Sequence, residues 1–328
     1  MEQWYIENDI IKRARIVEYL GLHVDDLKPE HLLPDDYDGY FPFMRMCNSI
    51  GDWGVLSGLF GALKQKYPKI KIALPNEDAI RRISKNLGDE NFYSRWNYNS
   101  NWPLNHNQEM ILKNNPHIDM YFGPGQLEFI YTDHERAYSG LTKENGKTVS
   151  IEEPLSEQIA RRFGFTNDDI ANIDLTPKLY FSEEEISKAK QTVEASGFDW
   201  HNYGCLLLAS RIEKLEGIQW TGDEHVLPFI EKFSDSPVFY YSSWDIDKSF
   251  WGNTFPAKKS FTDMNLSMRE QLCIKWHAKF NVGYQAGLHD VVTGGPSECI
   301  TITPYESVKE NWMRNTQYIY LDGRTKKD

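Results

Sequence analysis

Beyond its first 39 residues, the sequence alternates between short apolar runs and longer segments with helical spacing, and this alternation limits the possible folds most strongly. The run YFPFMRMC (40–47) has the length of a strand, and VLSGLFGALKQKY (55–67) has helical periodicity. A second strand is predicted at KIKIALP (69–75) and a second helix at EDAIRRISKNLG (77–88). A βαβα opening of this kind predicts a parallel sheet that is covered by helices on both faces.

The same alternation resumes in the second half of the chain. A capping box, SEEE, begins at Ser182 and predicts a helix to about Ala195. Further strands are predicted at 203–210, 237–243, 289–295 and 317–321, and further helices at 221–233 and 265–280. We therefore expect an α/β protein with two doubly wound domains that face each other across a cleft.

The length of 328 residues fits two domains, since a domain typically has about 150 residues. The polar segment 167–177 is the predicted linker. We place the N-terminal domain at 1–172, with 1–39 as a front extension, and the C-terminal domain at 173–328.

Composition and motifs exclude several classes of protein. A net charge of −12 argues against nucleic acid as a partner. No apolar run reaches the roughly 18–20 residues of a membrane helix, and no signal peptide is evident. The four cysteines are scattered, so we expect reduced thiols and a cytoplasmic protein. The sequence has no zinc motif, no P-loop and no hydrolase elbow, so no metal site is expected.

The segment NSIGDWG (48–54) joins the first predicted strand to the first predicted helix. A helix N-terminus orients anions and polar substrates, and it keeps a nearby carboxylate ionised. Asp52 is therefore a candidate general base, with Gly51 and Trp53 beside it as candidate substrate contacts. The structural alternative is that Asp52 only caps the helix and Gly51 only permits a turn.

Two other loops carry candidate phosphate ligands. After the strand at 203–209, Ser210, Arg211 and Lys214 place cations where they would stabilise a diphosphate leaving group. After the strand predicted from His289, Gly294 and Gly295 would let backbone amides approach a phosphate. In the same loop Ser297 would donate its hydroxyl to a phosphate, and Glu298 would accept hydrogen bonds from a ribose. The alternatives are a solvated basic pair and an ordinary Gly-Pro turn.

Aromatic residues are abundant, with 10 Trp, 18 Tyr and 17 Phe. Sugars stack on such rings, so Trp96 and Trp102 are candidate acceptor contacts together with Trp53. The usual role of an aromatic ring is core packing, which stays the alternative for each.

Five segments in order resemble glycosyltransferase family 9, the heptosyltransferase-type enzymes. The opening strand, Gly-Asp turn and helix at 44–76 is similar to the start of that family. Similar segments follow at 112–122, 174–198, 209–220 and 287–298. The last departs from the family pattern, with Pro296 and Glu298 where the family has Asp and Gly.

The resemblance implies a GT-B fold of two Rossmann-like domains, with the acceptor bound by the N-terminal domain and the nucleotide-sugar by the C-terminal one. It implies an inverting, metal-independent transfer to a saccharide or glycoconjugate hydroxyl, with Asp52 as base and the nucleotide-sugar as co-substrate rather than a cofactor. One alternative is a non-catalytic sugar- or nucleotide-sugar-binding protein of the same fold. A nucleotide-dependent oxidoreductase is less favoured, because GDWGVLSG lacks G-x-G-x-x-G.

Overall fold

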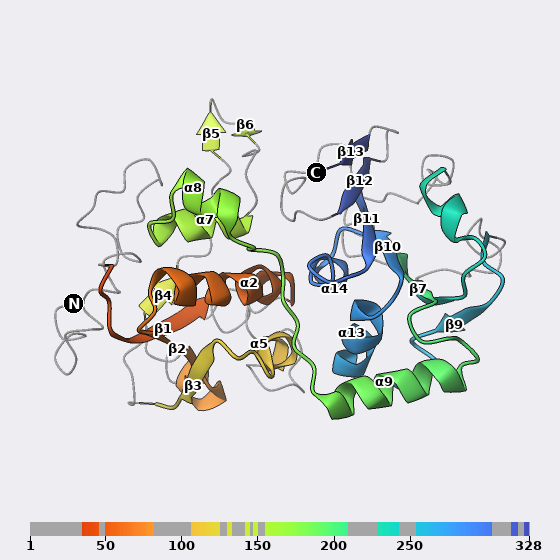
Figure 1. Cartoon of the computed structure of the whole chain (residues 1–328), viewed down its shortest axis with the longest axis horizontal. Helices are drawn as coiled ribbons and strands as arrows, with labels where there is room; N and C mark the ends of the chain where they lie inside the picture. The colour runs from red at the N-terminus through yellow and green to blue at the C-terminus, as the bar shows by residue number, and fades with distance from the viewer. Residues whose placement is uncertain are drawn as a thin grey trace. The chain divides into compact units, whose positions relative to one another are not determined.

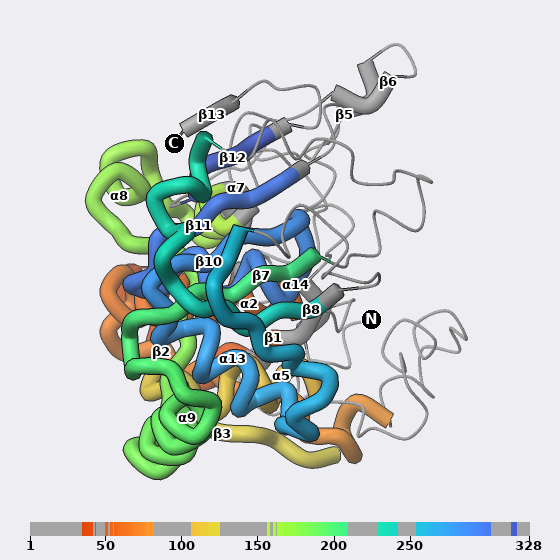
Figure 2. Tube along the Cα trace, turned by 90° about the vertical axis from the view of Figure 1, so that its right-hand side faces the viewer, coloured from red at the N-terminus to blue at the C-terminus, as the bar shows by residue number. Residues whose placement is uncertain are grey.

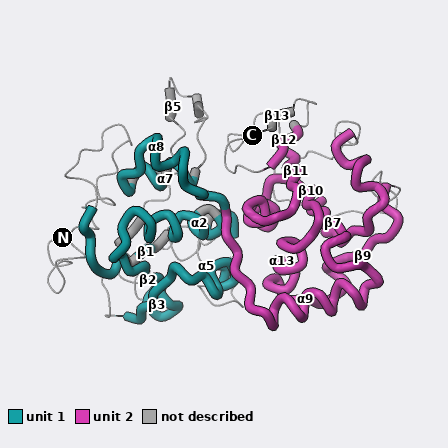
Figure 3. Tube along the Cα trace, in the orientation of Figure 1, with its two compact units in different colours: residues 1–176 teal, residues 177–328 magenta. Residues whose placement is uncertain are grey.

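A computed structural model gives the structure of the chain, and it divides into two compact units, Met1–Thr176 and Pro177–Asp328 (Figure 3). The predicted linker is partly helical, because α8 (Asn167–Asn172) begins there behind a Thr166 capping box. The residues that the structure describes are 35–45, 50–81, 106–124, 130–132, 142–144, 147–149, 155–208, 228–242, 254–303, 316–320 and 325–327.

Unit 1 is built on a four-stranded parallel sheet with the strand order β3-β2-β1-β4. The strands are β1 (Gly39–Arg45), β2 (Ile70–Pro75), β3 (Ile118–Phe122) and β4 (Ile130–Thr132). The chain runs outward from β1 to β3 and then returns to the other side of β1. The direction of winding therefore changes between β1 and β4. A separate antiparallel pair is formed by β5 (Thr142–Glu144) and β6 (Lys147–Val149).

Helix α2 (Ile50–Lys66) connects β1 to β2 and contacts both α5 (His106–Leu112) and α7 (Leu155–Arg162) (Figure 1). The apolar side chains that recur with helical spacing, Leu56, Leu59, Phe60 and Leu63, are all buried. The helix begins at Ile50 rather than at Val55, so the glycines predicted to form a turn lie in its first turn. Four phenylalanine rings, with centroids 5.4–6.0 Å apart, join this layer to the sheet: Phe41, Phe43, Phe60 and Phe163.

Unit 2 contains a seven-stranded sheet with the order β13-β12-β11-β10-β7-β8-β9. All neighbouring strands are parallel except β12 and β13. The strands are β7 (Gly204–Leu208), β8 (Val238–Ser242), β9 (Lys258–Ser260), β10 (Phe280–Tyr284), β11 (Glu298–Thr303), β12 (Gln317–Tyr320) and β13 (Thr325–Lys327). The chain runs from β7 outward to β8 and β9 and then returns to form β10 on the other side of β7. The winding direction therefore changes between β7 and β10.

Two helices, α9 (Glu183–Ala195) and α13 (Met268–Trp276), pack side by side on one face of this sheet (Figure 2). The predicted capping box at Ser182 is confirmed, and Ser267 forms a second one for α13. The opposite face of the sheet packs against Ile230 and Phe233, next to the short helix η5 (Glu231–Phe233).

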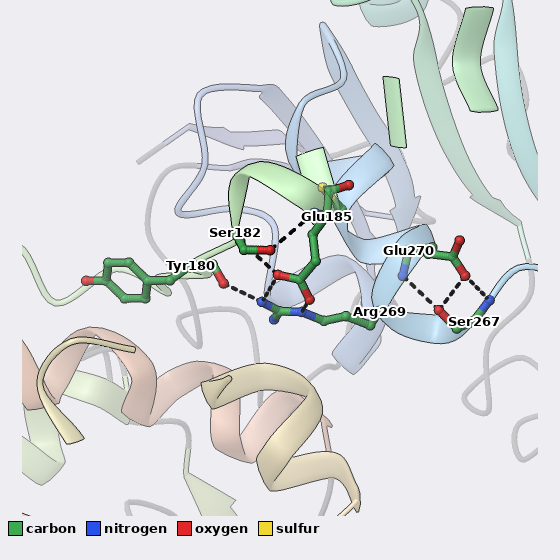
Figure 4. A network of polar contacts seen from close by, with 7 residues as sticks. Tyr180, Ser182, Glu185, Ser267, Arg269 and Glu270 are labelled. Carbon is green, nitrogen blue, oxygen red and sulfur yellow. Dashed lines mark hydrogen bonds and ion pairs between the residues drawn. The ribbon is translucent and has the colours of Figure 1, made fainter. Parts of the chain in front are cut away.

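Arg269 ties α13 to α9 and to the chain that precedes α9 (Figure 4). Its guanidinium donates to both carboxylate oxygens of Glu185, at 3.0 and 3.3 Å, and to the backbone carbonyl of Tyr180. It also lies 4.3 Å from the ring centroid of Phe181. These contacts hold the chain before α9, at the start of unit 2, against α13.

One strand prediction in unit 2 is wrong. The residues from His289 to Gly295 form the end of the short helix α14 (Gly287–Asp290) and a turn, and the strand lies earlier, at β10. The segment that follows the two glycines is itself a strand, β11. Because β11 begins at Glu298, the segment at 293–298 leads into the amino edge of the sheet and does not leave its carboxyl edge.

Candidate functional site

In a doubly wound sheet, ligands bind beyond the carboxyl ends of the strands, at the point where the winding direction changes. In unit 1 that point follows β1. The chain enters α2 five residues after β1 ends at Arg45, which puts Gly51 and Asp52 in the first helical turn at this edge. Gly51 is buried, and the side chain of Asp52 lies outside the described residues. The backbone thus places Asp52 beyond the carboxyl end of β1, beside the change of winding.

Trp53 does not have the exposure expected of an acceptor contact. Its side chain is 0% exposed and belongs to the core of unit 1. An aromatic ring must present a face to stack on a sugar, so Trp53 acts by packing, as the structural alternative held. Trp96 and Trp102 lie outside the described residues.

In unit 2 the winding changes between β7 and β10. Ser210, Arg211 and Lys214 follow the carboxyl end of β7 by two to six residues, and they lie outside the described part of the chain. In the sequence they come shortly after the carboxyl end of this strand. The strand from which they depart is buried along its whole length.

The loop at 293–298 does not share that edge. Glu298 opens β11 and pairs in register with Phe280, the first residue of β10, so this loop ends at the amino edge of the sheet. A strand of five residues spans about 17 Å, which separates Glu298 from the carboxyl end of β7. The structure therefore places Glu298 at the edge of the sheet opposite to the one where β7 ends.

The four candidate residues of that loop have structural partners. A Cβ on Gly294 would lie 1.9 Å from the carbonyl oxygen of Pro177, and one on Gly295 would lie 3.1 Å from the Trp276 ring. The Ser297 hydroxyl donates to the carbonyl of Ala278 at 2.6 Å. Glu298 forms an ion pair with Lys232. The glycines allow close packing of the protein against itself, and no free phosphate cradle results.

The carboxyl end of β10 carries a turn that the sequence analysis did not identify as a site. Gln285 follows the strand directly and its backbone amide donates to the carbonyl of Ile302 at 2.9 Å, before α14 begins at Gly287. This turn lies at the same edge of the sheet as the carboxyl end of β7, beside the same change of winding. The sequence did not point to this turn, because the strand was predicted at 289–295 and lies at Phe280–Tyr284.

His289 anchors this turn from inside the protein. It is fully buried, and its Nε2 lies 3.0 Å from the hydroxyl oxygen of Thr301, which in turn lies 2.6 Å from that of Thr316. Burial, and secondarily the amine of Lys275, lower the pKa of His289 to about 3 against a smaller opposing effect of the Ile300 carbonyl. His289 is therefore a neutral, structural imidazole at physiological pH.

Metal-binding clusters and membrane helices were sought among the described ranges alone. No group of three or more His, Cys, Asp or Glu side chains there is placed to hold a metal ion. In the same ranges, no helix has both the length and the apolar character required to cross a membrane.

Comparison with known proteins finds matches among solved structures. A glycosyl transferase of family 9 from Veillonella parvula aligns with 87% of this chain and 86% of its own, at 10% identity and a TM-score of 0.51. The ADP-heptose lps heptosyltransferase II of E. coli aligns with 86% of this chain and 90% of its own, at 12% identity and the same TM-score. The chain has the GT-B fold. No family model and no curated protein sequence matches it.

A GT-B protein has two Rossmann-like domains, and both units of this chain have that parallel, doubly wound architecture. The expected fold class is thus confirmed. Identities of 10–12% establish the fold alone.

Proposed function

We propose that this chain is a glycosyltransferase that moves a sugar from a nucleotide-diphosphate-sugar to a hydroxyl group of a saccharide or glycoconjugate acceptor. The observation that carries the proposal is the GT-B fold along most of the chain, with Asp52 after the internal strand β1 and two cations after the internal strand β7. A place in cytoplasmic glycan biosynthesis belongs to the same proposal, and the free thiols of Cys205, Cys273 and Cys299 are consistent with it.

The first step takes place on unit 1, which binds the acceptor. Asp52 accepts the proton of the acceptor hydroxyl, and the oxygen then attacks the anomeric carbon from the face opposite the leaving group, which inverts that centre. The first turn of α2 favours the ionised form of the carboxylate through its backbone amides and its dipole.

The second part of the reaction depends on unit 2, which binds the nucleotide-sugar. As the bond between the anomeric carbon and the diphosphate oxygen breaks, negative charge grows on the leaving nucleoside diphosphate. Arg211 supplies a bidentate fork and Lys214 a point charge, with Ser210 as a hydroxyl donor. Two cations neutralise a diphosphate without a metal ion, so the proposed transfer is metal-independent.

Replacing the proposed base tests the mechanism. Asp52→Asn should lower kcat by about 10²–10⁴-fold, because general-base catalysis contributes that much, while the donor Kd stays within twofold of the wild-type value. Asp168→Asn, in the exposed helix α8, is the matched control and should retain full turnover. Wild-type turnover by Asp52→Asn would rule out the base assignment.

Replacing the proposed donor ligands tests which edge of the sheet binds the nucleotide. Arg211→Gln should raise the donor Kd by about tenfold or more, since a charged hydrogen bond contributes roughly 1.5–3 kcal/mol. Glu298→Gln changes a side chain at the opposite edge and should leave that Kd unchanged. The reverse pattern, with a loss only for Glu298→Gln, would place the donor at the amino edge.

A panel of nucleotide-sugars separates a transferase from a binding protein of the same fold. A donor at 100 times its Kd stabilises the folded state by about 2.7 kcal/mol, which a thermal shift detects. Turnover is then followed as nucleotide release in the presence of acceptors. Tight donor binding without release for any acceptor would favour the non-catalytic alternative.

A further inference from the structure

The short helix α14 is joined to the sheet of unit 2 through a buried polar side chain, that of His289. The imidazole is 0% exposed, and its Nε2 atom lies 3.0 Å from the hydroxyl oxygen of Thr301 on β11. That oxygen lies 2.6 Å from the hydroxyl oxygen of Thr316, which directly precedes β12. A chain of three polar side chains, each at most 4% exposed, therefore connects α14 to two neighbouring strands.

The imidazole of His289 lies over the sheet close to its carboxyl edge. Gly283 on β10 pairs in register with Thr301 on β11 and with Leu207 on β7, so these three residues mark one level of the sheet. A Cβ atom on Gly283 would lie 3.2 Å from the Nδ1 atom of His289, so the ring occupies the space above this glycine. Both β7 and β10 continue for one residue beyond this level. His289 therefore lies near the ends of the two strands between which the winding changes.

The turn between β10 and α14 follows the position of that helix. The backbone carbonyl of Ala286 accepts from the backbone amides of His289 and Asp290, both at 2.8 Å. Ala286 is also the N-cap of α14 and forms no side-chain capping bond, so its side chain does not hold the start of the helix. The contact between His289 and Thr301 ties the helix to the sheet, and the turn is held in place with it.

We propose that His289 is a positioning residue for the nucleotide-sugar site, and that it holds the turn at 285–287 in place through Thr301 and Thr316. The inference rests on the proposed function, because it takes the donor to bind beyond the carboxyl ends of β7 and β10, beside this turn. Since the imidazole is buried, it acts through the backbone of the turn and does not touch the donor.

A hydrogen bond restrains the turn more closely than an apolar contact does. The strength of a hydrogen bond depends on both distance and angle, whereas packed apolar side chains can slide against each other. Ligand sites require their contacting groups to be held within about 0.5 Å. The directional bond between His289 and Thr301 meets that requirement from inside the protein.

Thr301→Val tests the proposal, because it removes the hydroxyl partner of His289 and keeps the size of the side chain. ADP, GDP, UDP, CDP and dTDP are titrated into the wild-type protein, and the one that binds most tightly is used with the variants. We expect Thr301→Val to raise its Kd by about tenfold or more, since small displacements in a site are costly, at a temperature where the variant is fully folded. Thr301→Ser keeps a hydroxyl and should retain a Kd close to that of the wild type.

Tyr203→Phe is the matched control, because it also removes one buried hydroxyl of unit 2. The Tyr203 hydroxyl donates to the carbonyl of Ile274 at 2.8 Å, and Tyr203 directly precedes β7, at the amino edge of the sheet. This variant should lower the urea midpoint of unfolding, as Thr301→Val does, and leave the nucleotide Kd unchanged. An equal rise in Kd for both variants would show a general effect of lost stability and would overturn the proposal.

The experiment separates a failure of this inference from a failure of the proposed function. Nucleotide binding by the wild type with an unchanged Kd in folded Thr301→Val would overturn the role of His289 alone. Absence of binding by the wild type for all five nucleoside diphosphates would contradict the proposed function, and this inference with it.

Discussion

Two glycines of helix α2 differ in what a side chain would meet. A Cβ on Gly58 would lie 2.1 Å from the carbonyl oxygen of Thr176 and 2.9 Å from that of Leu175, so the backbone at the end of unit 1 passes directly against it. The three atoms nearest to a Cβ on Gly61 all belong to the side chain of His117, the first at 3.1 Å. Backbone cannot yield as a side chain does, so only the first position requires glycine.

This difference yields a paired prediction. Gly58→Ala should destabilise unit 1 by about 1–3 kcal/mol through overpacking. Gly61→Ala should cost much less or be neutral, since alanine gains up to about 1 kcal/mol of helix propensity over glycine. Urea unfolding of both variants measures the difference. Equal effects of the two substitutions would contradict the argument.

The burial of Trp53 gives a second prediction for a single residue. Trp53→Ala should lower the free energy of unfolding by about 3–5 kcal/mol, as expected when a large core side chain is removed. Trp53→Phe should retain much of that stability and leave acceptor KM unchanged. A selective rise in acceptor KM in a stable Trp53→Phe protein would restore the role of a substrate contact.

At the scale of elements, two ion pairs join α9 to α13, and they differ in burial. Arg269 and Glu185 are 12% and 16% exposed, whereas Lys188, which pairs with Glu270 at 2.7 Å, is 65% exposed. Exposed pairs contribute roughly 0–1 kcal/mol because solvent screens them. A buried carboxylate that loses its cation loses charged hydrogen bonds as well.

Arg269→Met should therefore destabilise unit 2 by about 1–3 kcal/mol, and Lys188→Met by less than about 1 kcal/mol. Chemical denaturation of the two variants measures both values. Each variant removes one ion pair between the same two helices. A difference between the two losses of stability therefore reflects the burial of the pair and not the number of pairs. A larger loss for Lys188→Met would show that burial does not decide the outcome.

Sequence periodicity predicted the elements whose faces follow a regular apolar pattern. The strands β1, β2, β7, β8 and β12 and the helices α2, α9 and α13 occur where the spacing indicated them. It failed at β10 because Asn281 and Gly283 interrupt the apolar run. Tertiary contacts impose those residues, since Lys275 and His289 lie over that face. The valines at 291 and 292 then favoured a strand where a helix end and a turn occur.

The error at β10 led to one predicted part of the site, the loop at 293–298, being assigned to the wrong edge of the sheet. In the sequence Asp52 follows β1, and Ser210, Arg211 and Lys214 follow β7; both of these strands were identified correctly. The loop at 293–298 was assigned to the carboxyl edge because a strand was expected to precede it. A strand follows it instead, which moves it to the other edge. Local sequence patterns do not show that β11 pairs with β10.

At the scale of the whole molecule, buried histidines make stability depend on pH. Burial lowers the pKa of His289 to about 3 and lowers that of His277 in the same direction, with the neighbouring His201 as a smaller cause. The unfolded chain, with a histidine pKa near 6.5, then binds more protons than the folded one. Stability is therefore fully present above about pH 6.5 and falls as the pH drops below it.

We expect the free energy of unfolding to decline between about pH 6.5 and pH 5, before most carboxylates titrate. His289→Gln should flatten that decline, because glutamine binds no proton in either state. Denaturation of the wild-type protein and of the variant at a series of pH values measures the two slopes. An unchanged slope in His289→Gln would show that another group controls the acid response.

The buried cysteines of unit 2 can report when this unit opens. Cys205, Cys273 and Cys299 are buried, and burial raises the pKa of each thiol to about 12. An alkylating reagent at pH 8 therefore reacts with them only in molecules that have transiently opened. In a Cys47→Ser background, the time course of alkylation would report the opening of unit 2 separately from that of unit 1, without an engineered cysteine.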